Sequence, residues 1–302
     1  NMSSDKLPEM PNIKDEEFPD VDVLIATHNE DTKLLYKTIN GCKHMRYPDK
    51  SKVHIYLCDD NDRPQMRDLA KQFGIGYFGL ADNKFAKAGN INNALRQTNS
   101  PLIATFDADM IPTSRFLLET VPYFFLPQYK KDGDGNWIKK EKEDKEKVGF
   151  IQTPQSFYNP DLFQYNLYSE KNIPNEQDYF FREINIGRNR TNSAIYAGSN
   201  TVISRQALED VGYIVEGSIT EDFATGIEIQ KKGYLCFAID KTLAHGLAPT
   251  DLPGLIKQRE RWGRGCIQTM RSSKLIFSKM PFGTKLSYIS SFLYWWTFLR
   301  RF

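Results

Sequence analysis

Short apolar runs alternate with helical patterns along the first third of the chain. Each run is followed by a stretch in which apolar residues recur every three or four positions. We therefore predict buried strands at 21–26, 53–58, 75–78 and 102–106. Strands that alternate with helices in this way are typical of a doubly wound, mostly parallel α/β sheet flanked by helices.

The pattern changes further along the chain. Residues 128–147 are highly charged with almost no apolar period, which predicts a hydrophilic surface insertion. The elements expected after it are a strand at 148–152, an aromatic-rich helical region at 157–181, two strands around a small-residue loop within 194–203, a helix from 221 to about 232 and a basic helix at 252–270.

The two ends of the chain depart from the α/β pattern. Residues 1–19 are rich in charge and proline, which predicts a disordered lead-in to one α/β domain at 20–250. In the C-terminal segment at 251–302, the stretch from Leu286 to Leu299 is apolar and aromatic. It is shorter than the roughly 20 residues that span a bilayer, so we interpret it as an interfacial helix or the beginning of a membrane segment. The alternative is an amphipathic helix packed on a soluble domain.

Composition and charge narrow the class of protein only a little. The chain has 302 residues, and its 40% hydrophobic and 26% charged residues are ordinary for a globular protein. A formal net charge of +2 gives no reason to expect a nucleic acid partner. The four cysteines form no CxxC pair, which favours reduced, mostly buried thiols in a cytosolic compartment. Basic residues gather late in the chain, where an anionic partner is expected: Lys257, Arg259, Arg261, Arg264, Arg271, Lys274, Lys279 and Lys285.

Two carboxylates follow the predicted strand at 102–106. Asp107 and Asp109 stand on alternate positions at its C-terminal end, which is the edge where open α/β sheets bind ligands. They repel each other unless a cation lies between them, and a hard ion such as Mg²⁺ or Mn²⁺ suits oxygen ligands and phosphates. The pattern indicates a metal site with a phosphorylated substrate. A solvated turn with two surface aspartates is the alternative.

The basic helix at 252–270 carries a second group of candidate side chains. Gln258, Arg261 and Trp262 are three and four positions apart, so they share one helix face. A guanidinium pairs with phosphate oxygens and an indole stacks on a sugar ring, which indicates a phosphate-and-sugar surface. A solvated basic face with one buried tryptophan is the alternative. Two acidic residues, Glu221 and Asp222, begin the preceding helix after Thr220, a good N-cap residue. A purely structural role, in which they stabilise the helix dipole, is the alternative to a role in chemistry.

Taken in order, eight short motifs resemble those of the membrane-embedded processive β-glycosyltransferases of family 2, bacterial cellulose synthase catalytic subunits in particular. They are ATHNE, LCDDN, KFAKAGNIN, FDADM, IQTPQ, YAGSN, ITEDFATG and QRERWGRG, and they extend from Val21 to Ile267. The resemblance implies a GT-A-type fold at 20–250, followed by the QxxRW helix and a membrane-proximal segment at 251–302.

The resemblance also implies a role for each matching residue. It assigns the donor nucleotide to one set of side chains: Thr27, Glu30, Asp59 with Asp60 nearby, Lys87, Asp107, Gln258 and Arg261. Asp107 and Asp109 would hold Mg²⁺ or Mn²⁺. Asp222 would be the general base, and Trp262 would bind the acceptor sugar beside Glu221.

The activity implied by the resemblance is inverting transfer of glucose from UDP-glucose to the end of a growing β-glucan chain. The partners would be the donor, the glucan acceptor and a membrane, with the catalytic domain on the cytoplasmic side. FAKAGN is similar to the glucan synthases, which favours UDP-glucose. The chain departs from the family's usual pattern at Asn61, Met110 and Gln155, where glycine, histidine and histidine are common.

Two other functions fit the same residues. One is a non-processive family 2 transferase that adds a single sugar to a lipid or protein. The other is a scaffold that binds nucleotide sugars without turnover.

Overall fold

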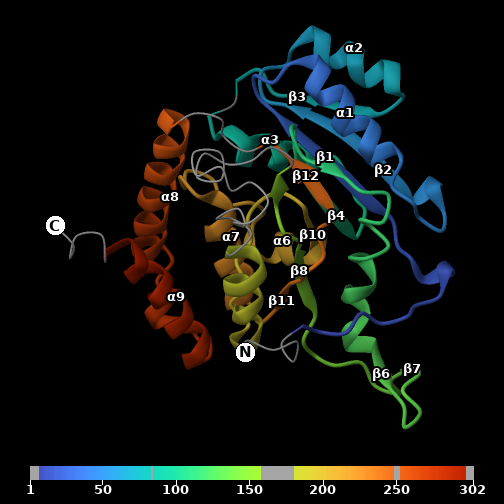
Figure 1. Cartoon of the computed structure of the whole chain (residues 1–302), viewed down its shortest axis with the longest axis vertical. Coiled ribbons are helices and arrows are strands. Elements are labelled where there is room, and N and C mark those ends of the chain that lie inside the picture. Colours follow the sequence, from blue (N-terminus) through green and yellow to red (C-terminus); the bar gives the residue numbers. More distant parts are fainter. Residues whose placement is uncertain (1–6, 83, 158–179, 248–251, 297–302) are drawn as a thin grey trace, which may run out of the picture.

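A seven-stranded sheet forms the centre of the computed structural model of the chain (Figure 1). The structure describes residues 7–82, 84–157, 180–247 and 252–296. The strand order is β11-β8-β10-β4-β1-β2-β3, and only β10 runs antiparallel to its two neighbours. The predicted doubly wound, mostly parallel α/β fold is confirmed.

The strands of this sheet are β1 (Val21–Thr27), β2 (Val53–Asp59), β3 (Gly76–Gly79), β4 (Leu102–Asp107), β8 (Val148–Gln152), β10 (Thr201–Ser204) and β11 (Leu235–Ala238). Two smaller sheets contain β5 (Ile111–Pro112), β9 (Ser156–Phe157) and β12 (Ala244–Gly246), and β6 (Tyr129–Lys131) with β7 (Trp137–Lys139).

The α-helices are α1 (Thr32–Lys43), α2 (Pro64–Phe73), α3 (Ala86–Leu95), α6 (Arg205–Val211), α7 (Glu221–Lys231), α8 (Leu252–Ser272) and α9 (Phe282–Trp296). Shorter 3-10 turns are η2 (Asp15–Glu17), η3 (Lys50–Lys52), η4 (Val121–Gln128), η6 (Arg188–Thr191) and η7 (Leu275–Phe277), and η5 (Phe180–Asn185) is a π-helical turn.

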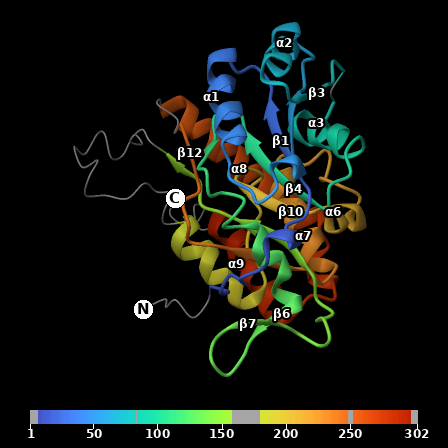
Figure 2. The ribbon, with the colours of Figure 1, turned by 90° about the vertical axis from the view of Figure 1, so that its right-hand side faces the viewer.

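Alternating side chains of β1 explain why helices cover both faces of the sheet. Val23 and Ile25 belong to the hydrophobic cluster that includes residues of α1 and α2. Leu24 and Ala26 point the other way, into the cluster that includes residues of α3, α6 and α7. Every residue of β1 is buried, as expected for a strand covered on both sides. Figure 2 shows α1 and α3 on opposite sides of this strand.

The parallel strands end together at one edge of the sheet. In the strand register Thr27 lies opposite Asp59, and Ala26 lies opposite Asp107. The polar residues that follow β1, β2 and β4 are therefore brought to one place from positions far apart in the sequence. This edge is where α/β sheets bind ligands.

The C-terminal helices pack beside α7 at one side of the molecule (Figure 1). Tyr288 and Phe292 of α9 make edge contacts with Phe223 of α7. The buried guanidinium of Arg188 donates to Ser287 O and Ser291 Oγ and lies over the Tyr288 ring, which ties α9 to the α/β domain. Among the described residues, no helix has the length and apolar character needed to cross a membrane.

The structure differs from the sequence prediction in the lead-in. Ile13 and Phe18 are buried in the main hydrophobic cluster, and the Tyr47 hydroxyl donates to Pro19 O. Residues 7–19 are therefore ordered against the sheet, because two apolar side chains among many charges are enough to anchor a short segment. The prediction of disorder for them is wrong.

Other predictions are confirmed or corrected elsewhere in the chain. The insertion at 128–147 is the exposed β6–β7 hairpin that projects from the molecule in Figure 1. Within 194–203 only β10 is a strand, and the residues before it form a loop. The four cysteines are free and buried. Most of the helical region predicted at 157–181 lies outside the described residues.

Candidate active site

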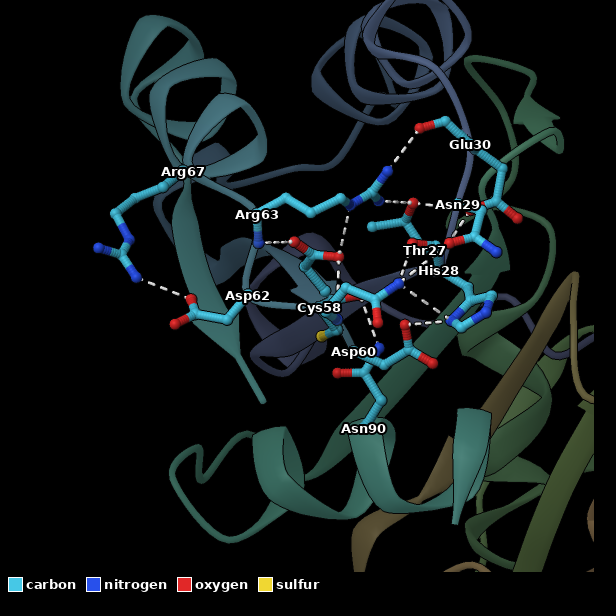
Figure 3. Close-up of polar contacts among 12 residues, drawn as sticks. Thr27, His28, Asn29, Glu30, Cys58, Asp60, Asp62, Arg63, Arg67 and Asn90 are labelled. Carbon is cyan, nitrogen blue, oxygen red and sulfur yellow. Dashed lines mark hydrogen bonds and ion pairs between the residues drawn. The ribbon is translucent and has the colours of Figure 1, made fainter. Parts of the chain in front are cut away.

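The end of β2 is organised around the fully buried carboxylate of Asp59. Arg63 donates to it from its backbone N at 2.6 Å and from Nε at 3.1 Å, and the Tyr77 hydroxyl donates at 3.1 Å. The other guanidinium nitrogens of Arg63 donate to Thr27 Oγ1 and Glu30 O, both at 2.8 Å (Figure 3). Arg63 thus joins the ends of β1 and β2. The Asp59 oxygens therefore already accept hydrogen bonds from Arg63 and Tyr77.

Glu30 is held as a carboxylate beside β1. Its Oε2 accepts the Thr27 hydroxyl at 2.8 Å and the His28 amide at 2.7 Å. Burial alone would raise the pKa of Glu30, but these hydrogen bonds and the charge of Arg63 outweigh it and lower the pKa. Glu30 therefore stays ionised at neutral pH, as a group that accepts hydrogen bonds must.

His28 and Asp60 extend this polar cluster toward α3. The His28 Nδ1 lies 2.5 Å from Asp60 Oδ1, and the Asn61 amide donates to His28 O at 2.8 Å (Figure 3). The family's usual glycine is thus replaced by an asparagine that braces the two strand ends. Sequence reasoning missed Arg63, although an arginine four residues after a strand-end aspartate is a signal for such a pair.

Lys87, near the start of α3, connects two sides of the site. Its Nζ lies 2.5 Å from Asp107 Oδ1 and 3.0 Å from Gly198 O. Burial alone would lower the pKa of Lys87, but the negative charges of Asp107 and Asp222 raise it above its usual range. The ammonium group is therefore permanently charged and stands where a substrate phosphate could bind it.

Asp109 meets the conditions for a cation ligand. Burial and the negative charge of Asp107 raise the pKa of Asp109 to about 6, and Glu30 adds to the repulsion. Two crowded carboxylates of this kind are stabilised by a hard divalent ion. The described residues contain no set of three acidic, histidine or cysteine side chains that could enclose a metal ion alone. Asp107 and Asp109 therefore fit an ion that takes its other ligands from phosphates and water.

Asp222 begins α7 and faces the same group of residues. Withdrawal from water raises its pKa to about 7, with opposing effects from Lys87 and Arg261 and further increases from Glu221 and Asp107. Thr220 precedes the helix but its hydroxyl makes no capping bond, so the expected N-cap interaction is absent. A carboxylate with this pKa can accept a proton near neutral pH.

Gly198 lets the Asp222 carboxylate approach the loop after Tyr196. Gly198 has φ +77°, and a Cβ at this position would lie 2.0 Å from Asp222 Oδ2. Only glycine combines this backbone conformation with this contact. The same residue accepts the Lys87 hydrogen bond, so Lys87, Asp107 and Asp222 meet around Gly198.

Replacing Gly198 with alanine is expected to displace the Asp222 carboxylate and to reduce sugar transfer about 30-fold, in addition to a stability loss of about 1 kcal/mol from the left-handed backbone. Gly212→Ala is the matched control, because Gly212 has φ +83° and open space around it. Initial rates and thermal unfolding of both variants measure the difference. Equal activity in the two variants would contradict the placement of Asp222.

The basic helix α8 approaches this centre through two contacts with the loop before α7. A Cβ on Gly265 would lie 2.3 Å from Thr220 Cγ2, and Gln268 hydrogen-bonds to Ile219 N at 2.8 Å. The charge of Arg261 acts on Asp222. These contacts bring the predicted face of α8 to the side of the site that contains the candidate base.

The other two predicted side chains of α8 are Trp262 and Gln258. Arg259 lies over the ring of the half-buried Trp262, at 5.1 Å from its centroid. Gln258 Oε1 is buried and has no hydrogen-bond partner within the part of the chain that is described. A sugar hydroxyl could donate to such an acceptor. The acceptor role of Trp262 and Glu221 stays a prediction.

The arrangement combines three chemical capacities at one sheet edge. Crowded carboxylates can hold a divalent ion, Lys87 and Arg261 supply positive charge, and Asp222 can accept a proton. Together these groups suit displacement of a phosphorylated leaving group by a hydroxyl, with no covalent intermediate.

Comparison with known proteins identifies the class to which this site belongs. Residues 102–301 match the family model described as Glycosyl transferase family group 2. The chain is 33% identical over 287 residues to the cellulose synthase catalytic subunit [UDP-forming] of Pseudomonas fluorescens (strain SBW25), covering 95% of the chain and 36% of the relative. It is 32% identical over 278 residues to the corresponding subunit of Xanthomonas axonopodis pv. citri (strain 306), covering 92% and 36%.

Solved structures support the fold. A mannosyltransferase of Pyrobaculum calidifontis, in complex with GDP-Man and Mn²⁺, has a TM-score of 0.68 and 16% identity over 95% of this chain and 73% of that chain. S. aureus TarS in complex with UDP-GlcNAc has a TM-score of 0.59 and 12% identity over 91% and 71%. The fold is that of the GT-A glycosyltransferases.

The chain belongs to glycosyl transferase family group 2. It is similar to cellulose synthase catalytic subunits over most of its own length, and it spans only about a third of theirs. The predicted family is confirmed.

Proposed function

We propose that the chain is the catalytic domain of an inverting transferase that adds glucose from UDP-glucose to the end of a growing β-glucan. We place the reaction at the cytoplasmic face of a membrane. The observation that carries the proposal is the meeting of Lys87, Asp107 and Asp222 around Gly198, at the end of a strand that also leads to Asp109. The similarity to subunits named as UDP-forming cellulose synthases supports the choice of donor and product.

The reaction follows from the charges of these side chains. As the bond between the sugar and the diphosphate breaks, negative charge develops on the leaving UDP, and Lys87 and Arg261 stabilise it. Asp222 accepts the proton of the attacking hydroxyl as the new glycosidic bond forms. Direct attack on an α-linked donor gives a β-linked product. Mg²⁺ or Mn²⁺ held by Asp107 and Asp109 would supply further stabilisation of the departing diphosphate.

The nucleotide would lie across the ends of β1 and β2. The Thr27–Glu30 and His28–Asp60 pairs offer hydrogen-bonding groups there, and Asp59 with Arg63 holds them in place. The acceptor would approach from α8, where Trp262 offers a ring for stacking and Gln258 offers a buried oxygen that has no hydrogen-bond partner among the described residues. A stacking ring on the helix that carries Arg261 suits a growing chain better than a single small acceptor.

The proposal is tested by incubating the protein with UDP-glucose, Mn²⁺ and short β-glucan acceptors, followed by UDP detection and linkage analysis of the product. Release of UDP with an acceptor extended by β-linked glucose is the expected result. Products with a single added sugar would indicate the non-processive transferase, and binding of UDP without its release from UDP-glucose would indicate the non-catalytic scaffold.

Transfer is expected to decline below about pH 7. Because burial raises the pKa of Asp222 to about 7, the base is lost by protonation as the pH falls through that value. The rate should then decrease about tenfold for each further pH unit. Since the charge of Glu221 raises the pKa of Asp222, Glu221→Gln should move the midpoint of kcat/KM to lower pH. A flat profile to pH 5, or a shift to higher pH in that variant, would contradict the assignment of the base.

A further inference from the structure

The motif IQTPQ has no role in the proposed reaction, yet its first glutamine is one of the most extensively bonded side chains in the described structure. Gln152 ends β8 and is fully buried. Its Oε1 accepts the Ala197 amide at 2.8 Å and the Thr201 hydroxyl at 2.7 Å. Its Nε2 donates to Thr153 O and Ser199 O, both at 2.9 Å. All four hydrogen-bonding positions of the amide are therefore occupied.

Two of the partners of Gln152, Ala197 and Ser199, belong to one loop, residues 197–200, which connects the three central groups of the site. Ser199 Oγ accepts the Asp107 amide at 2.9 Å. Gly198 O accepts a hydrogen bond from the Lys87 ammonium at 3.0 Å, and the absence of a side chain on Gly198 leaves room for the Asp222 carboxylate. The loop is not part of a strand, and several of its backbone groups bond to side chains instead of to a neighbouring strand. Gln152 supplies those bonds for Ala197 and Ser199.

We infer that Gln152 is a positioning residue, which holds the 197–200 loop so that Lys87, Asp107 and Asp222 keep their mutual geometry. The inference rests on the proposed function. Gln152 touches none of the groups that would meet substrate, and it acts through the loop. The loop places Gly198 against the Asp222 carboxylate and the Gly198 carbonyl against the Lys87 ammonium. A small displacement of the loop would disturb both contacts. A catalytic group that is misplaced by about 1 Å can lose a factor of about 100 in rate.

The test replaces Gln152 with methionine, which has similar length but no amide. We expect kcat to decrease about 30-fold while the affinity for UDP with Mn²⁺ changes by less than about twofold, because the uridine-side contacts of β1 and β2 remain. The matched control is Gln230→Met. Gln230 is also a buried glutamine and bonds to Ala194 O and the Tyr288 hydroxyl, away from the loop. The Gln230→Met variant should lose about as much thermal stability as Gln152→Met and keep the kcat of the wild type.

Hydrogen exchange gives a readout that needs no turnover. The amides of Ala197 and Asp107 should exchange about tenfold faster in Gln152→Met than in the wild type or in Gln230→Met. If the wild type transfers no sugar, the proposed function fails, and the exchange rates still decide whether Gln152 holds the loop. Unchanged exchange at both amides would overturn the inference.

A milder variant covers the case in which Gln152→Met does not fold. Thr201→Val has nearly the same shape and removes the hydroxyl that lies 2.7 Å from Gln152 Oε1 and 2.9 Å from Ser199 O, so it weakens the support of the same loop. It should lower kcat about threefold with UDP affinity preserved. If Gln152→Met folds and keeps the kcat of the wild type, the positioning role is overturned. If Gln152→Met does not fold, an unchanged kcat in Thr201→Val overturns it. Equal losses of kcat in Gln152→Met and Gln230→Met would also overturn it.

Discussion

Asp222→Asn is expected to reduce sugar transfer at least about 1000-fold and to leave the affinity for UDP within about twofold of the wild type. The asparagine keeps the shape of the side chain and its contact with Gly198, but it cannot accept a proton from the attacking hydroxyl. Because the base acts on the acceptor, the nucleotide contacts at the ends of β1 and β2 stay intact. Initial rates of UDP release and calorimetric titration with UDP measure the two quantities.

Glu228→Gln is the control for charge removal on the same helix. Glu228 lies six residues after Asp222 on α7 and pairs with Lys231 at 2.9 Å, so its replacement should leave both transfer and UDP affinity unchanged. Loss of UDP binding in Asp222→Asn would mean that Asp222 belongs to the donor site. Retention of more than about a tenth of the activity would remove it as the base.

Asp109→Asn is expected to weaken UDP binding in the presence of Mn²⁺ about 100-fold and to leave metal-free binding nearly unchanged. The substitution removes one of the two carboxylates that hold the ion. Since the pKa of Asp109 is raised to about 6, the wild type should show the same weakening as the pH falls below that value and the carboxylate is protonated. Titrations of UDP with and without Mn²⁺ at several pH values test both statements.

Asp134→Asn provides the control for a surface aspartate. Asp134 lies in the exposed turn between β6 and β7, and Figure 1 shows this hairpin projecting away from the main sheet. Its replacement should not alter the Mn²⁺ dependence. An equal effect in the two variants, or an unchanged affinity in Asp109→Asn, would contradict the assignment of the metal ligands.

The strand pattern was predictable because it depends on local periodicity. The runs at 21–26 and 102–106 are short and apolar, and helices on both faces bury them as the pattern indicates. The parallel register of β1, β2 and β4 then places Thr27, Asp59 and Asp107 at the same edge of the sheet. This much of the candidate site follows from the sequence because strand ends are visible in it.

The supporting contacts were not predictable, because they join residues far apart in the chain. Nothing near Gln152 in the sequence indicates that it bonds to a loop more than forty residues later. The sequence alone likewise did not reveal that the Asp59 carboxylate accepts hydrogen bonds from Arg63 and Tyr77. The burial of Ile13 was missed because charged neighbours dominate the composition of that segment.

A crystal structure of the protein with UDP and Mn²⁺ tests the central claim most directly. The account predicts that Mn²⁺ lies between the diphosphate and the carboxylates of Asp107 and Asp109, with Lys87 turned to the phosphates and the Asp222 carboxylate beside the position of the transferred sugar. Uridine bound away from the ends of β1 and β2, or a diphosphate separated from Lys87 and Asp222, would contradict it.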